Sequence, residues 1–149
     1  MDNPLVPKHL SEAHISPPVW GILETPPTPG PHPGVVLLHG SSGWQTAYPQ
    51  IAKILADSGL VALAIDYYVE TGSYSQADEL KLWPVWQATV RNAVAYLQAN
   101  PSVSGRPIGL VGYSLGAYLA VSVASSIPAV TVVVEFFGGG SEVRETLEQ

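Results

Sequence analysis

Short apolar runs recur along the chain, and segments with helical spacing separate them. Each run has the length of a strand, and its unbroken apolar character is typical of a strand covered on both faces. A shorter strand is predicted at Val19–Leu23. The longer runs are Val35–Leu38, Leu60–Ile65, Pro107–Val111 and Thr131–Phe137.

Three segments between or beside these runs predict helices. The first ends near Gly59, the second carries Pro84 in its first turn and stops before Pro101, and the third runs from Leu115 to Ser126. Strands that alternate with helices through right-handed crossovers give a sheet covered on both faces. We therefore expect a three-layer α/β domain with a mostly parallel sheet. The apolar positions of the first two helices are Tyr48, Ile51, Ala52 and Leu55, and Trp86, Val90, Ala93, Val94 and Leu97.

Composition narrows the class of protein. The chain has 149 residues, of which 46% are hydrophobic and 12% charged, enough for one domain with a sizeable core. The net charge of −6 and the lack of a basic cluster argue against nucleic-acid binding. With no cysteine, no metal-ligand spacing and no dinucleotide fingerprint, we expect neither a metal nor a cofactor. No apolar stretch has membrane-spanning length and the N-terminus lacks a signal-peptide pattern, so we expect a cytoplasmic protein that does not bind membranes.

The segment Gly112-Tyr113-Ser114-Leu115-Gly116 has the pattern G-x-S-x-G of a nucleophile elbow. An apolar strand precedes it and a predicted helix follows it, which is the context that the pattern requires. We expect Ser114 to be held in a strained turn, with glycines at 112 and 116 because side chains there would collide with backbone. The backbone N–H of Leu115 is then a candidate oxyanion donor. The alternative is that Ser114 only caps the helix.

Four segments together resemble the dienelactone hydrolase family of the α/β-hydrolase fold, over roughly residues 17–141. The resemblance implies a hydrolase of esters or lactones with Ser114 as nucleophile, and by position it places a second oxyanion donor on the backbone N–H of Ser41. Characterised family members carry a glutamate where this chain has Gly40, so a general carboxylesterase activity is favoured over dienelactone hydrolysis. The segments are VVLLHGSSG (35–43), LVALAIDYY (60–68), IGLVGYSLG (108–116) and VVVEFFGG (132–139).

The histidine and the acid of a catalytic triad do not follow the elbow as they do along the chain of this fold. All four histidines, His9, His14, His32 and His39, precede Ser114. We therefore expect residues 1–149 to be the N-terminal, nucleophile-bearing part of a single α/β-hydrolase domain without its last strands. A segment outside these residues would supply the acid and the histidine, and a second polypeptide would cover the apolar edge strand 131–137.

Other residues near the elbow allow two interpretations each. His39 could act as the base, but a hydrogen-bonded structural role in its loop is favoured. Asp66 could be a triad acid or a cap of the loop that follows it. Trp44, Tyr67 and Tyr68 could line an acyl pocket or pack in the core. Two further carboxylates, Glu135 and Glu142, lie near the place of the acid in some hydrolases of this fold.

These observations predict a serine hydrolase that cleaves a small carboxylic ester or lactone through an acyl-enzyme on Ser114. The alternative is a non-catalytic binding or interaction module on a truncated hydrolase scaffold.

Overall fold

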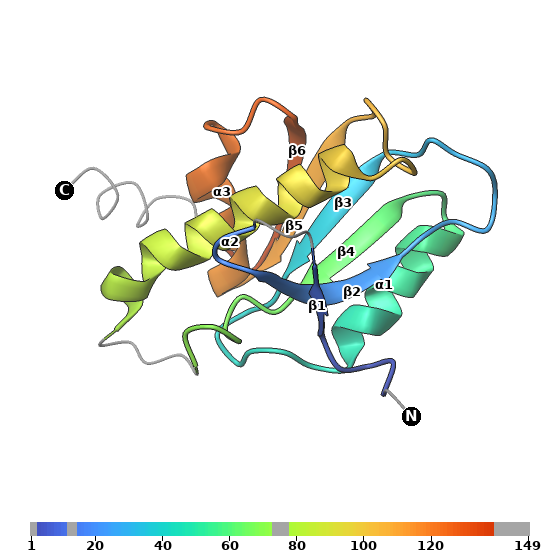
Figure 1. The fold of residues 1–149 in the computed structure, drawn as a ribbon. Helices are drawn as coiled ribbons and strands as arrows, with labels where there is room; N and C mark the ends of the chain where they lie inside the picture. Colours follow the sequence, from blue (N-terminus) through green and yellow to red (C-terminus); the bar gives the residue numbers. More distant parts are fainter. Residues whose placement is uncertain (1–2, 12–14, 73–77, 139–149) are drawn as a thin grey trace.

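The computed structural model describes residues 3–11, 15–72 and 78–138, and places six strands in one sheet (Figure 1). The strand order is β1-β2-β4-β3-β5-β6. Strands β4, β3, β5 and β6 are parallel, whereas β1 and β2 pair antiparallel at the other edge. The elements are β1 (Lys8–Leu10), β2 (Val19–Glu24), β3 (Gly34–Leu38), α1 (Ala47–Asp57), β4 (Val61–Ile65), α2 (Glu79–Ala99), β5 (Ile108–Tyr113), α3 (Leu115–Ala124) and β6 (Val130–Phe136).

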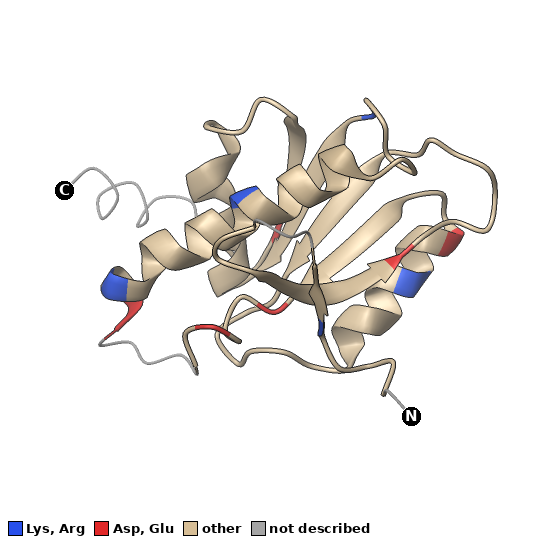
Figure 2. Cartoon of the chain, in the orientation of Figure 1, with Lys and Arg blue, Asp and Glu red and all other residues tan. Residues whose placement is uncertain are grey.

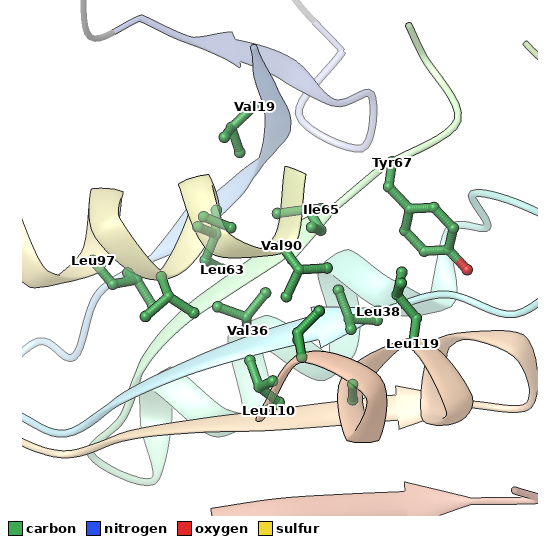
Figure 3. Close-up of a cluster of buried hydrophobic side chains, with 14 of the residues drawn as sticks. Val19, Val36, Leu38, Leu63, Ile65, Tyr67, Val90, Leu97, Leu110 and Leu119 are labelled. Carbon is green, nitrogen blue, oxygen red and sulfur yellow. The ribbon is translucent and has the colours of Figure 1, made fainter. Parts of the chain in front are cut away.

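Helices cover both faces of this sheet, which confirms the predicted three-layer α/β arrangement. Successive residues of a strand point to opposite faces. On one face, Val36 of β3 and Leu63 of β4 pack beneath α2 and α3, and Figure 3 shows Val90 and Leu97 of α2 directed toward them. On the other face, Leu37 and its neighbours pack against α1. The continuous apolar runs of the sequence are therefore strands buried on both sides.

The start of α2 differs from the sequence prediction, which placed Pro84 in the first turn. The helix begins five residues earlier, at Glu79, so Pro84 lies inside it. A proline at this position removes one backbone hydrogen bond near the helix start. The buried stripe from Trp86 to Leu97 offsets this loss, because its side chains are fully buried in the core. The prediction was wrong because the preference of proline for a first helical turn is local, whereas the start of this helix also depends on how the residues after Pro84 pack in the core.

The charged residues are few and dispersed (Figure 2). In the described part of the chain, the Lys and Arg residues lie on separate surfaces of β1, α1, α2 and the turn before β5: Lys8, Lys53, Lys81, Arg91 and Arg106. Over the same ranges, no helix combines the length and the apolar character needed to cross a bilayer.

Strand β6 is the last strand of the described sheet, and its outer surface is apolar. Val132 and Val134 are 55% and 40% exposed, and Phe136 is 43% exposed. These side chains share one face of β6, the face on which α1 covers the central strands. Apolar side chains therefore remain open to solvent beside β5 and β6 within this chain.

Candidate active site

Ser114 lies at the turn between β5 and α3, with its side chain exposed. Its backbone has φ +51° and ψ −114°, a conformation that a residue with a side chain rarely adopts. Ser114 occupies the N-cap position of α3, yet its side chain makes no capping hydrogen bond. The hydroxyl is thus not used as a helix cap, and the interpretation of Ser114 as a mere capping residue fails.

The two glycines of the motif permit a close approach of backbones around this turn. A Cβ atom at position 112 would collide with the carbonyl oxygen of Gly116. A Cβ atom at position 116 would lie 2.5 Å from the carbonyl oxygens of both Leu38 and His39. The predicted reason for the glycines is confirmed, and the second contact shows that α3 starts directly against the end of β3.

The loop after β3, residues 39–43, lies beside the serine. A Cβ atom on Gly40 would come within 3.5 Å of the Ser114 Cβ atom and 3.2 Å of the Tyr113 carbonyl oxygen. A turn forms in this loop through a hydrogen bond of 3.0 Å from the Gly43 N–H to the Gly40 carbonyl oxygen. Ser41, at the tip, is exposed. The structure therefore brings the two sequence-predicted segments, the loop and the elbow, into contact.

The structure gives no hydrogen-bond acceptor, among the described residues, for the backbone N–H groups of Leu115 and Ser41. Leu115 is the first residue of α3, and N–H groups of a first helical turn have no partner within the helix. No acceptor among the described residues receives the N–H of Ser41. The positive end of the α3 dipole adds to the attraction of negative charge at this point.

His39 is fully buried, and both of its ring nitrogens are engaged. Nδ1 lies 2.8 Å from the carbonyl oxygen of Gly40, and Nε2 lies 3.0 Å from Oδ1 of Asp66. The same Asp66 oxygen accepts the N–H of Tyr68 at 3.0 Å. The expected structural histidine and loop-capping carboxylate are both confirmed. His39 has no ring nitrogen left with which to take a proton from Ser114.

Three tyrosines surround this histidine and hold its loop. The Tyr67 ring stacks on His39 with centroids 4.0 Å apart, and its hydroxyl donates to the His39 carbonyl oxygen at 2.6 Å. The Tyr68 hydroxyl donates to the carbonyl oxygen of Ser41 at 3.2 Å, and the Tyr48 hydroxyl accepts the N–H of Gly40 at 3.2 Å. Sequence reasoning placed Tyr48 only in the stripe of a helix, and no local pattern connects it to a loop eight residues away.

The residues proposed as an acyl pocket lie in different surroundings. Tyr67 is only 2% exposed, and burial raises its pKa well above the usual value for tyrosine, with Tyr68 adding to the effect. It therefore packs beneath the loop and contributes no open surface. Trp44 is half-buried, and its indole N–H donates to the Leu5 carbonyl oxygen at 2.9 Å. Trp44 thus closes the end of the loop against the N-terminal segment.

The other described histidines lie on elements away from Ser114. His9 lies on β1, at the opposite edge of the sheet from β6, and contacts Trp20. His32 lies before the amino end of β3, whereas Ser114 follows the carboxyl end of β5. Glu135, by contrast, is exposed on β6 in register with Gly112, so this carboxylate lies beside the elbow. The remaining candidates, His14 and Glu142, lie outside the described residues.

An apolar groove runs along β5 and β6 on the face that carries α1. Its volume is about 470 Å³. Tyr113 and Phe136, whose rings stack with centroids 5.0 Å apart, close the end next to Ser114. Partial burial raises the pKa of Tyr113, and the neighbouring Tyr48 adds to this effect. Other lining residues are Ile51, Leu55, Val111, Val132 and Val134.

A mostly parallel sheet with a strained serine at the turn between a strand and a helix, beside a loop from the neighbouring strand, defines the α/β-hydrolase fold. Residues 19–149 match the dienelactone hydrolase family, and the chain belongs to that family. The resemblance inferred from the sequence is confirmed.

Proteins similar to this chain include thioesterases and esterase-like hydrolases. Acyl-coenzyme A thioesterase 1 of Homo sapiens is 35% identical over 129 residues, which cover 87% of this chain and 29% of the thioesterase. A dienelactone hydrolase-like promiscuous phosphotriesterase from metagenomic libraries superimposes with a TM-score of 0.71 at 25% identity, covering 83% of this chain and 55% of that one. The dienelactone hydrolase of Anabaena variabilis gives a TM-score of 0.65 at 23% identity, with 89% and 64% covered. The chain thus spans less than a third of the length of the thioesterase.

Proposed function

We propose that this chain carries the nucleophile of an acyl hydrolase that cleaves carboxylic esters, lactones or thioesters through an acyl-enzyme on Ser114. The observation that supports this most is the exposed serine at φ +51°, lying against the loop of residues 39–43. Membership of the dienelactone hydrolase family supports ester and lactone chemistry. The similarity to acyl-coenzyme A thioesterases extends the proposal to thioesters.

The proposed reaction has two halves. The Ser114 Oγ attacks the carbonyl carbon while its proton passes to a base, and the carbonyl electrons move to the oxygen. The N–H groups of Ser41 and Leu115 stabilise this oxyanion. When the carbonyl re-forms, the bond to the leaving alcohol or thiol breaks, and that group takes the proton from the base. Water then attacks the acyl-Ser114 ester in the same manner and releases the acid.

A histidine and an acid from outside these 149 residues complete the site in this proposal. Two observations support it. His39 is committed to Gly40 and Asp66, and the other described histidines lie on distant elements. The apolar side chains of β6 are also open to solvent. We propose that one further polypeptide, carrying the remaining part of the hydrolase domain, pairs with β6 along 131–137 and supplies both groups.

Covalent labelling of the purified chain tests the proposal. A fluorophosphonate probe should add one adduct, located by intact mass and peptide mapping at Ser114, and Ser114→Ala should abolish it. The matched control is Ser125→Ala, which removes an exposed serine from the other end of α3. Turnover of p-nitrophenyl butyrate and of a fatty acyl-coenzyme A, measured in parallel, distinguishes oxygen esters from thioesters. Without a base we expect slow turnover, lower by several orders of magnitude than in a complete triad.

The absence of any adduct and of any turnover, in a folded sample, would favour the alternative of a binding module. An adduct that forms equally in Ser114→Ala would contradict the assignment of the nucleophile.

A further inference from the structure

The buried imidazole of His39 takes no part in the proposed reaction, yet it lies directly beneath the loop that faces Ser114. We infer that His39 is a positioning residue, which orients the Gly40–Ser41 peptide so that the Ser41 N–H faces the substrate oxygen. The orientation itself is a property of the loop, whereas its use in catalysis rests on the proposed function.

In the peptide unit between Gly40 and Ser41, the direction of the carbonyl group determines the direction of the N–H group. In a planar trans peptide the C=O and the N–H point in opposite directions. The carbonyl oxygen of Gly40 accepts hydrogen bonds from Nδ1 of His39 at 2.8 Å and from the N–H of Gly43 at 3.0 Å. These two donors fix the direction of that carbonyl, and thereby turn the N–H of Ser41 to the opposite side.

The N–H of Ser41 points to the side of the loop on which the reaction at Ser114 would occur. The imidazole is fully buried, whereas Ser41 and Ser114 are both exposed. Gly40 lies close enough to the serine that a Cβ atom there would be 3.5 Å from the Ser114 Cβ. A carbonyl held toward the core therefore presents the Ser41 N–H at the exposed surface beside Ser114.

The contacts of His39 fix the plane and the rotation of its imidazole ring. A carbonyl oxygen can only accept, so Nδ1 must carry a hydrogen in its contact with Gly40, whatever Nε2 carries toward Asp66. On the other side, the Asp66 carboxylate holds Nε2, and the N–H of Tyr68 holds that carboxylate oxygen. The Tyr67 ring lies parallel to the imidazole within 9°. The plane and the rotation of the ring are thus each set by a named contact.

The neighbouring peptide shows the same arrangement. The His39 carbonyl oxygen accepts the Tyr67 hydroxyl, and the N–H across that peptide, from Gly40, donates to the Tyr48 hydroxyl. Because this N–H is already used, Gly40 cannot serve as the second oxyanion donor. This leaves the N–H of Ser41 for that role, as the resemblance implied.

A pair of isosteric substitutions separates positioning from mere packing. The side-chain amide nitrogen of His39→Asn can take the place of Nδ1, while that of His39→Gln takes the place of Nε2. Both variants lose the stacking on Tyr67, so each controls the other for stability. For the Ser114 reaction with the fluorophosphonate and with p-nitrophenyl butyrate, we expect His39→Asn to stay within about threefold of wild type. His39→Gln should lose tenfold or more, in the range of about 10²-fold for a lost oxyanion donor, in kcat and not in KM.

Amide exchange followed by NMR gives a second measurement that needs no activity. The Gly43 N–H, which shares the Gly40 carbonyl, should exchange about fivefold faster in His39→Gln than in His39→Asn. In the unmodified chain, a hydrogen on Nδ1 of His39 should appear as a slowly exchanging downfield resonance, which can be observed even if neither variant folds.

Each outcome bears on one of the two proposals. Equal losses in both variants, a greater loss in His39→Asn, or an Nδ1 without hydrogen would overturn the positioning role. If the unmodified chain shows no reaction at Ser114 at all, the proposed function fails, and the NMR measurements alone decide whether His39 orients the loop.

Discussion

The backbone N–H of Ser114 donates a hydrogen bond to the carbonyl oxygen of Phe136, with an N···O distance of 2.8 Å. This bond joins the strained turn after β5 to the last residue of β6. The conformation of the serine is therefore held by three elements, because α3 begins against the end of β3 on the other side. A residue at positive φ persists only where its surroundings over-determine it.

Replacing the serine should expose the strain of this turn. Ser114→Ala keeps a side chain at φ +51°, whereas Ser114→Gly allows the same backbone without steric cost. The strain relieved exceeds the extra conformational entropy of glycine in the unfolded chain, so we expect Ser114→Gly to be more stable than Ser114→Ala by about 1 kcal/mol. Urea unfolding of the two variants measures the difference. Equal stabilities would contradict a strained elbow.

The glycine before the serine should tolerate no side chain. A Cβ atom at position 112 collides with the backbone of Gly116 and Ala117, which cannot move without displacing α3. We expect Gly112→Ala to destabilise the fold by about 3 kcal/mol or more. Gly109→Ala is the matched control in the same strand, because its Cβ would meet no atom closer than 3.5 Å. Thermal unfolding of both variants is the measurement, and similar melting temperatures would count against the close packing of the elbow.

Much of the fold was predictable because the central strands are buried on both faces. The apolar runs at 35–38 and 60–65 mark β3 and β4 to within a residue or so, since every residue of these two strands is buried. The start of α2 was not predictable, since a proline rule describes a single turn and takes no account of the stripe that packs beyond it. Nor did any local pattern indicate that β2 would pair antiparallel with β4.

One part of the candidate site was likewise predictable from the sequence, and another part was not. The contact between Gly40 and Ser114 follows from two motifs at the carboxyl ends of adjacent parallel strands, and could be expected. The roles of Tyr67 and Tyr48 depend on the direction of a hydroxyl in three dimensions, which composition and spacing do not encode. A pattern can therefore name the nucleophile, but not the side chains that orient its partner loop.

The groove along β5 and β6 should bind an apolar dye. Val134 lines this groove and is 40% exposed, whereas Val121 is 45% exposed on α3 and lies outside it. A glutamate in the groove should reduce the binding of anilinonaphthalene sulfonate, because its charge interrupts the apolar face and repels the sulfonate. We therefore expect Val134→Glu to lower the dye fluorescence roughly twofold and Val121→Glu to leave it unchanged. An equal change in dye fluorescence for both variants would show that the dye does not report on the groove.

Stability should fall at alkaline pH because of Tyr67. Burial, with a smaller effect from Tyr68, raises the pKa of Tyr67 above its ordinary value of 10.0. Above about pH 10 the unfolded chain releases the phenolic proton while the folded chain keeps it, so the free energy of unfolding decreases as the pH rises. The full contribution is present below about pH 10 and is lost progressively as the pH rises from there through the raised pKa of the folded chain.

Tyr67→Phe separates this effect from the rest of the chain. The variant keeps the ring that stacks on His39 but has no proton to lose. It should be less stable than wild type near neutral pH, since it lacks the hydrogen bond to the His39 carbonyl oxygen, and its stability should decline less steeply at alkaline pH. Urea unfolding across this range gives both quantities. Parallel curves for the two proteins would mean that the Tyr67 hydroxyl titrates alike in the folded and unfolded chains.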